Sequence, residues 1–162
     1  MIEQGSFRDP TARVFYQDGR VFRGLDAAAA ATDAKVRDSG LMDLLVGEGL
    51  LVANWIAEDV AAPEGVPSER VIESRRISTI NYPSEWSFSM LRDAALATLD
   101  ANLIALNKGF ILKDASAFNV VFEGTKPLII DIASVDEFGD EGIWVAYGQF
   151  CDHFLAPLML EA

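Results

Sequence analysis

The chain has 162 residues, 51% of them apolar, which is enough to build a sizeable core in one domain or a pair of lobes and excludes extended disorder. Twenty-five acidic against 13 basic residues give a net charge of -12, which disfavours unaided binding to nucleic acid or anionic membranes. A single cysteine excludes an internal disulfide, and no apolar run reaches the ~18 residues of a transmembrane helix. Residues 1–10 lack the apolar run of a signal peptide, so we predict a cytoplasmic protein.

The first half of the chain is predicted to open with a β-hairpin that leads into a helix. Two strand-like runs flank Asp18-Gly19, a dipeptide suited to the positive φ angles of a tight turn. Asp26 is expected to cap an alanine-rich helical stretch reaching about residue 46, which Ser39-Gly40 can divide into two helices. The pattern then predicts three further segments: a buried strand or strand plus turn at 49–57, a loop at 62–69, and a strand ending before Pro83.

The second half is predicted to contain a long helix, a hairpin and a partly helical tail. Apolar residues between Ser87 and Lys108 recur every three or four positions, as in an amphipathic helix: Leu91, Ala95, Leu99, Leu103 and Leu106. Gly109 supplies the C-terminal stop, and residues 120–131 read as a hairpin that turns at 123–126. The apolar end at 158–160 has no polar tapering, which predicts that the natural chain continues.

Three oxygen-bearing side chains surround the predicted hairpin. Asp114 and Asn119 are five positions apart, and Asn119 and Asp131 stand at its two ends, which lie side by side in an antiparallel pair. Carboxylate and amide oxygens are the groups that hold Mg²⁺ and orient a hydroxyl nucleophile in phosphoryl transfer. Asp and Asn also cap turns and strand ends, so a purely structural role stays open.

At these residues the sequence resembles the protein-kinase-like superfamily, whose catalytic loop reads Asp-x-x-x-x-Asn and is followed by a short hairpin and a metal-binding Asp. "DASAFN" (114–119) matches the first part, and "IIDIAS" (129–134) contains the second. The resemblance implies that Asp114 orients an acceptor hydroxyl and that Asn119 and Asp131 hold Mg²⁺ on ATP. Arg23 and Lys113 are the nearest candidates for contacts to nucleotide phosphates, because no glycine-rich loop and no strand-borne lysine with a helical glutamate partner are evident.

A second resemblance runs nearly end to end and is carried by "FRDP" (7–10), "LKDASAFNVVF" (112–122), "PLIIDIASV" (127–135) and "VAYGQFCDHFLAPL" (145–158). These motifs, in this order, resemble the N-terminal region of a bacterial family of class I SAM-dependent methyltransferases related to nodulation proteins. The resemblance implies that a methyltransferase domain follows, that this domain is the partner of the present region, and that SAM binds only there. The nearest glycine-rich stretch here, Gly47-Glu48-Gly49, precedes a predicted strand, which does not suit a SAM site.

We therefore predict an α+β, protein-kinase-like fold with two parts: a small N-lobe with a β-hairpin and helix at 1–80, and a truncated, mainly helical C-lobe with the catalytic-loop hairpin at 81–162. The first functional hypothesis is a kinase-like accessory region of a transferase that binds Mg²⁺ with a nucleotide or a phosphorylated acceptor. Two alternatives stay open: a non-catalytic scaffold that docks the methyltransferase domain, and an active small-molecule phosphotransferase. Cys151-Asp152-His153 is predicted to be structural, because residues two apart on a helix face different directions.

Overall fold

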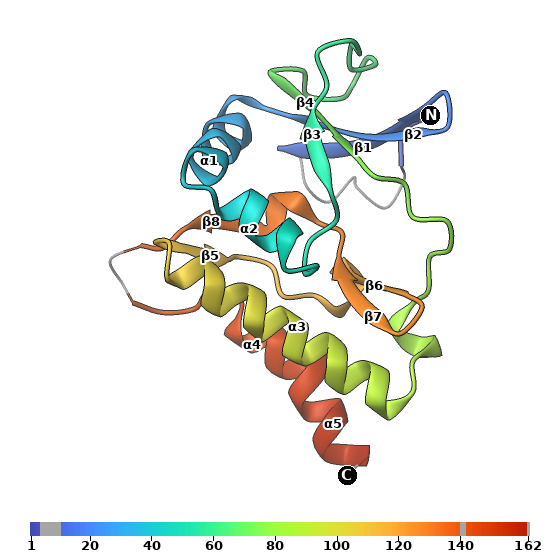
Figure 1. Ribbon diagram of the computed structural model, residues 1–162, viewed down its shortest axis with the longest axis vertical. Coiled ribbons are helices and arrows are strands. Elements are labelled where there is room, and N and C mark those ends of the chain that lie inside the picture. The colour runs from blue at the N-terminus through green and yellow to red at the C-terminus, as the bar shows by residue number, and fades with distance from the viewer. Residues whose placement is uncertain (4–10, 140–141, 162) are drawn as a thin grey trace. The chain divides into compact units, whose positions relative to one another are not determined.

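The chain begins with an antiparallel hairpin of β1 (Ala12–Gln17) and β2 (Arg20–Leu25), as the sequence predicts. Asp18 and Gly19 at its turn both have positive φ, 51° and 77°, the backbone that a two-residue turn between twisted strands requires. The computed structural model (Figure 1) describes residues 1–3, 11–139 and 142–161. Residues 7–10, which carry the first motif of the family resemblance, lie outside the described residues.

The chain divides into two compact units. The first comprises Met1–Lys35 and Ala53–Arg76, and the second comprises Val36–Val52 and Ile77–Ala162. The expected division fell at residue 80, with everything before it in one lobe. Residues 36–52 instead group with the second unit because Leu51 forms a parallel bridge with Ile129, and the Ile129 N–H donates to the Leu50 carbonyl.

The first unit is built on a four-stranded antiparallel sheet of order β1-β2-β4-β3. β3 spans Asn54–Ile56, and β4 spans Arg70–Ser74. Phe15 and Phe22 stack at 5.2 Å in its core, together with smaller apolar side chains. The predicted buried strand at 49–57 is wrong in part, because β3 is short and its Trp55 and Ile56 are about half exposed. The predicted strand before Pro83 also ends earlier, at Ser74.

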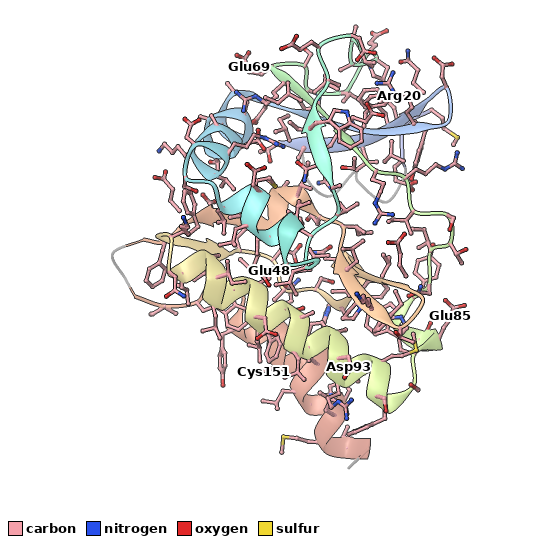
Figure 2. The ribbon with its side chains drawn as sticks, viewed as in Figure 1. Arg20, Glu48, Glu69, Glu85, Asp93 and Cys151 are labelled. Atoms are coloured by element: carbon pink, nitrogen blue, oxygen red, sulfur yellow. The ribbon has the colours of Figure 1, made fainter. Side chains whose placement is uncertain are left out.

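Two helices follow the first hairpin. α1 (Ala27–Asp38) begins after Asp26, whose carboxylate accepts the Ala29 N–H at 2.8 Å, so the predicted cap is confirmed. Gly40 then adopts φ 74° and α2 (Leu41–Gly47) starts, which confirms the predicted division of the helical stretch. The Gly47-Glu48-Gly49 stretch forms the end of α2, where Glu48 is the C-cap residue (Figure 2).

The long helix α3 (Phe88–Leu106) begins at Ser87, whose hydroxyl accepts the Met90 N–H, and it ends before Gly109, which has φ 82°. Its existence and bounds agree with the prediction, but the predicted apolar face is wrong in part. Ala95 on that face is buried, whereas Leu103 is 58% exposed, and the other buried apolar residues of the helix are small: Ala94, Ala97, Ala101 and Ala105. α3 packs against strands β5 and β7, and small side chains allow strand backbones to approach a helix closely.

The rest of the second unit consists of two small antiparallel sheets and a helical C-terminus. β5 (Phe110–Leu112) pairs with β8 (Val135–Glu137), and β6 (Val120–Glu123) pairs with β7 (Lys126–Ile129). Short 3₁₀ turns lie at Pro83–Glu85, Ala117–Asn119 and Ile132–Ser134. The tail forms α4 (Tyr147–Phe150), one π-helical stretch (Cys151–Leu155) and α5 (Ala156–Glu161), and it lies alongside α3 (Figure 1).

Candidate functional site

The β6–β7 hairpin brings Asn119 and Asp131 together at its open end. Val120 pairs with Ile129, and the Ile130 N–H donates to the Asn119 carbonyl at 2.8 Å. Asn119 and Asp131 therefore occupy neighbouring positions on adjacent chain segments, as the spacing of twelve residues predicts. The Asp131 carboxylate also accepts the Ala133 N–H at 3.1 Å and caps the following 3₁₀ turn.

The loop from Leu112 to Asn119 is held by an unusual number of backbone hydrogen bonds. Seven of its eight N–H groups, all but that of Asp114, donate to named acceptors. Three of these acceptors are side chains of helices outside the loop: Asn102, Gln149 and His153. Loops usually leave many amides to water, so this loop is built to hold one conformation.

Asp114 lies inside this loop and supports it directly. Its carboxylate accepts the Ser116 N–H at 2.9 Å, a local turn that fixes the side chain toward the following residues. Asp114 and Asn119 line the same small cavity, together with the buried Thr98 and Ser134. The structure thus brings Asp114 and Asn119 to one cavity, and Asp131 is not among the residues that line it.

The helical tail supplies two anchors that sequence reasoning missed. Gln149 Oε1 accepts the Ala115 N–H at 2.7 Å, and His153 Nδ1 accepts the Ala117 N–H at 3.2 Å. The Nδ1 lone pair therefore faces the loop backbone, and the Ser116 hydroxyl oxygen lies 3.3 Å from the same nitrogen. Gln149 and His153 are four positions apart, which in a helix predicts a shared face. The sequence does not indicate that this face contacts the loop.

The structural role predicted for Cys151-Asp152-His153 agrees with the position of His153, which accepts a hydrogen bond from the backbone of the loop. Cys151 lies on the π-helical stretch between α4 and α5 (Figure 2). Its hydrogen bond with Tyr147 raises the pKa of the Tyr147 hydroxyl above 10.0. π-Helical turns are rare, and they are often found near functional sites.

The two cations predicted to contact phosphate occupy different surroundings. Lys113 Nζ lies 3.6 Å from the Asp136 carboxylate, and both side chains are about two-fifths exposed. Arg23 lies on β2 of the first unit, opposite Ile72 of β4. A phosphate contact for either residue stays a prediction.

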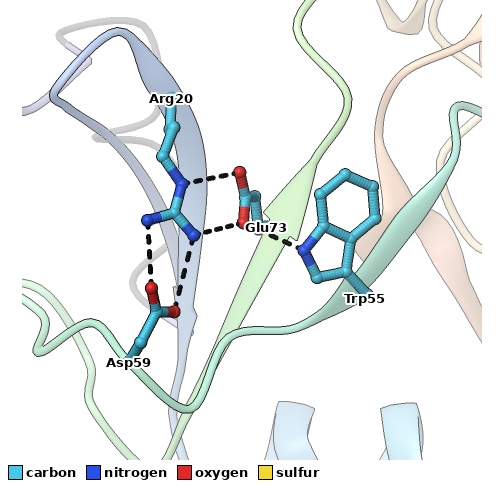
Figure 3. Close-up of polar contacts among 4 residues, drawn as sticks. All are labelled: Arg20, Trp55, Asp59 and Glu73. Atoms are coloured by element: carbon cyan, nitrogen blue, oxygen red, sulfur yellow. Dashed lines mark hydrogen bonds and ion pairs between the residues drawn. The ribbon is translucent and has the colours of Figure 1, made fainter.

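An ion-pair network on the first sheet was not predicted (Figure 3). Arg20 on β2 donates two hydrogen bonds to Glu73 on β4, at 2.8 and 2.6 Å, and it also bonds the exposed Asp59. Trp55 Nε1 donates to the same Glu73 carboxylate at 2.9 Å. The Arg20 hydrogen bonds hold the pKa of Glu73 below its ordinary value, lower the pKa of Asp59 and raise that of Arg20.

The donor set of the candidate site suits a hard cation. Asp114, Asn119 and Asp131 offer carboxylate and amide oxygens, which Mg²⁺ prefers over nitrogen or sulfur ligands. Within residues 1–3, 11–139 and 142–161, no three His, Cys, Asp or Glu side chains gather into a metal site. A cation here would therefore need the Asn119 amide, and also oxygens from water or from a bound phosphate.

No protein-family model matches the sequence. The chain is 42% identical over 159 residues to the nodulation protein NoeA of Rhizobium meliloti (strain 1021). The match covers 98% of this chain but 33% of NoeA, so the chain spans about a third of the length of that relative. It is thus related to part of a nodulation protein, a name that specifies no reaction. Among the described residues, no helix combines the length and apolarity needed to cross a membrane.

Proposed function

We propose that the second unit is a kinase-like site that binds a divalent cation and, through it, the phosphates of a nucleotide or of a phosphorylated acceptor. One observation carries the proposal: the β6–β7 register places Asn119 beside Asp131, next to the loop that holds Asp114. The site would serve as an accessory part of a longer, nodulation-related protein. The family resemblance implies that this longer protein also carries a SAM-dependent methyltransferase domain.

Each residue has a separate task in this proposal. Asn119 and Asp131 hold the cation, and the bond from the Ala133 N–H to the Asp131 carboxylate is compatible with this because a carboxylate can accept more than one partner. Asp114, fixed by its bond to the Ser116 N–H, accepts the proton of an acceptor hydroxyl. When bound, Mg²⁺ supplies positive charge that neutralises phosphate oxygens.

The charge of the chain supports a cation as the intermediary. A net charge of -12 repels free phosphate and nucleotide. Lys113, the basic residue beside Asp114, already pairs with Asp136. A bound divalent cation reverses the local sign and allows an acidic surface to hold an anion.

The proposal is tested by calorimetric titration with MgCl₂ alone and then with ATP in the presence and absence of Mg²⁺. We expect ATP binding that requires Mg²⁺ and is lost in Asp131→Ala. The control is Asp100→Ala, which removes the same charge from an exposed position on α3. Failure of Mg²⁺ to bind, or equal loss of binding in both variants, would refute the proposal.

Catalysis is a further step within the same proposal. If the site transfers phosphate, Asp114→Asn should keep Mg²⁺-ATP binding and abolish turnover, because the amide cannot accept the hydroxyl proton. Binding without turnover in the unaltered chain would leave the accessory role and exclude the phosphotransferase alternative.

A scaffold that docks the methyltransferase domain is the second candidate function, and two observations favour it. The relative is about three times as long as the matched region. Apolar side chains are also exposed on the two helices that lie side by side in the second unit: Leu96 and Leu103 on α3, and Met159 and Leu160 on α5. Exposed apolar side chains gathered in one region mark interaction surfaces. Binding of this chain to the separately produced remainder of NoeA, weakened by Leu103→Asp and not by Asp100→Ala, would support the scaffold.

A further inference from the structure

The Asn119 amide is incompletely satisfied inside the second unit. Its Nδ2 is fully buried and has no acceptor among the described residues. A buried donor without a partner has lost its hydrogen bond to water and gained none in return, so such groups in folded proteins are usually paired with protein or ordered water. Asn119 also lines a cavity with about 10 Å³ of room for the centre of a water-sized sphere, the space of about one water.

Two hydroxyls around this cavity can act only as acceptors toward it. The Thr98 hydroxyl donates to the Ala94 carbonyl at 2.9 Å. The Ser134 hydroxyl donates to the Asp131 carbonyl at 2.7 Å. Both hydroxyl protons are therefore committed elsewhere, and both hydroxyl oxygens keep lone pairs for the cavity. Asp114, which also lines the cavity, contributes a carboxylate acceptor.

We infer that the cavity is a binding site for one structural water, which accepts a hydrogen bond from Asn119 Nδ2 and donates to two of the surrounding acceptors. The lining decides between water and an ion. A cation would leave the buried N–H donor of Asn119 unpaired, and an anion is repelled by Asp114. Water is a neutral ligand that can accept once and donate twice, which matches one donor facing several acceptors.

The same argument fixes the orientation of the amide. With Oδ1 turned inward, the side chains around the cavity would offer acceptors alone, and a water there would have no side-chain donor to accept from. Nδ2 therefore points inward, and Oδ1 is directed away from the water. This consequence rests on the proposed function: the buried water would present the oxygen of Asn119, rather than its nitrogen, to the cation.

The first test is a high-resolution crystal structure of the full chain, combined with NMR cross-peaks between water and the Asn119 side-chain amide. We expect an ordered water within hydrogen-bond distance of Nδ2 and a cross-peak from a long-lived water. A cavity filled by a side chain, or an Asn119 Nδ2 bonded to a protein acceptor without a water cross-peak, would overturn the inference.

A pair of variants tests the orientation of the water. Thr98→Val keeps the volume and removes one acceptor, so the Asn119 side-chain amide protons should exchange with solvent about fivefold faster, as for the loss of one ordinary hydrogen bond. Thr125→Val, on the exposed β6–β7 turn, should leave this exchange unchanged. Equal rates in both variants would also count against the site. An ordered water without Mg²⁺ binding would refute the proposed function alone, and Mg²⁺ binding without the water would refute this inference alone.

Discussion

Replacing Asn102 by alanine tests whether helix α3 holds the start of the candidate loop. Asn102 is 5% exposed, and its Oδ1 accepts the N–H of Leu112, a residue that is 2% exposed, at 2.9 Å. Alanine removes the acceptor and leaves a buried N–H that water does not reach, a loss of about 1–3 kcal/mol. A loss of about 2 kcal/mol lowers the midpoint of thermal unfolding by roughly 4–8 °C in a chain of this size.

Thermal unfolding followed by circular dichroism measures the global effect, and amide hydrogen exchange at Leu112 measures the local one. Asn107→Ala is the matched control, because Asn107 is the exposed C-cap residue of the same helix. We expect the Leu112 amide to lose protection in Asn102→Ala and to keep it in Asn107→Ala. Equal stability of the two variants, with unchanged exchange at Leu112, would refute the role assigned to Asn102.

Two further predictions concern the first unit. Glu73→Gln should lower stability near pH 7, because Arg20 holds the pKa of Glu73 below 4.5 and so stabilises the fold above that pH. The difference from the unaltered chain should shrink as pH falls through the depressed pKa, measured by urea unfolding between pH 3 and 7; a constant difference would contradict it. Gly24→Ala should destabilise the fold by about 1–3 kcal/mol, since the new Cβ would collide with the Pro67 carbonyl oxygen. The control Gly47→Ala places its Cβ in open space and should not destabilise the fold. Equal denaturation midpoints for the two variants would contradict this prediction.

Local chemistry explains the parts of the fold that could be predicted. The first turn follows from Asp18-Gly19, which adopts positive φ at both positions, and α3 lies where apolar residues recur at helical spacing between Ser87 and Lys108. The neighbouring positions of Asn119 and Asp131 follow from hairpin register alone. In each case the residues that determine the geometry are close in sequence, so no knowledge of tertiary packing is needed.

Tertiary packing explains what could not be predicted. The predicted stripe on α3 satisfied the helical period, yet Leu103 is exposed and most of the buried alanines lie outside the stripe, because β5 and β7 pack against the helix there. Arg20 and Glu73 lie 53 positions apart, and their pairing depends on the β2–β4 register rather than on any local pattern. The fold class is α+β as predicted, whereas the protein-kinase-like topology stays a hypothesis.

The hydrogen bonds that hold the loop around Asp114 help to distinguish a cation-binding loop from a simple surface turn. A surface turn between two strands can satisfy its amides with nearby groups and water. Here Asn102, Gln149 and His153 reach into the loop from two helices, 10 to 36 positions away. These bonds restrict the Asp114 carboxylate and the Asn119 amide to one geometry. A cation site would require such fixed ligands, whereas a turn that only reverses the chain would not. Removal of Gln149 or His153 should therefore affect cation affinity more than overall stability.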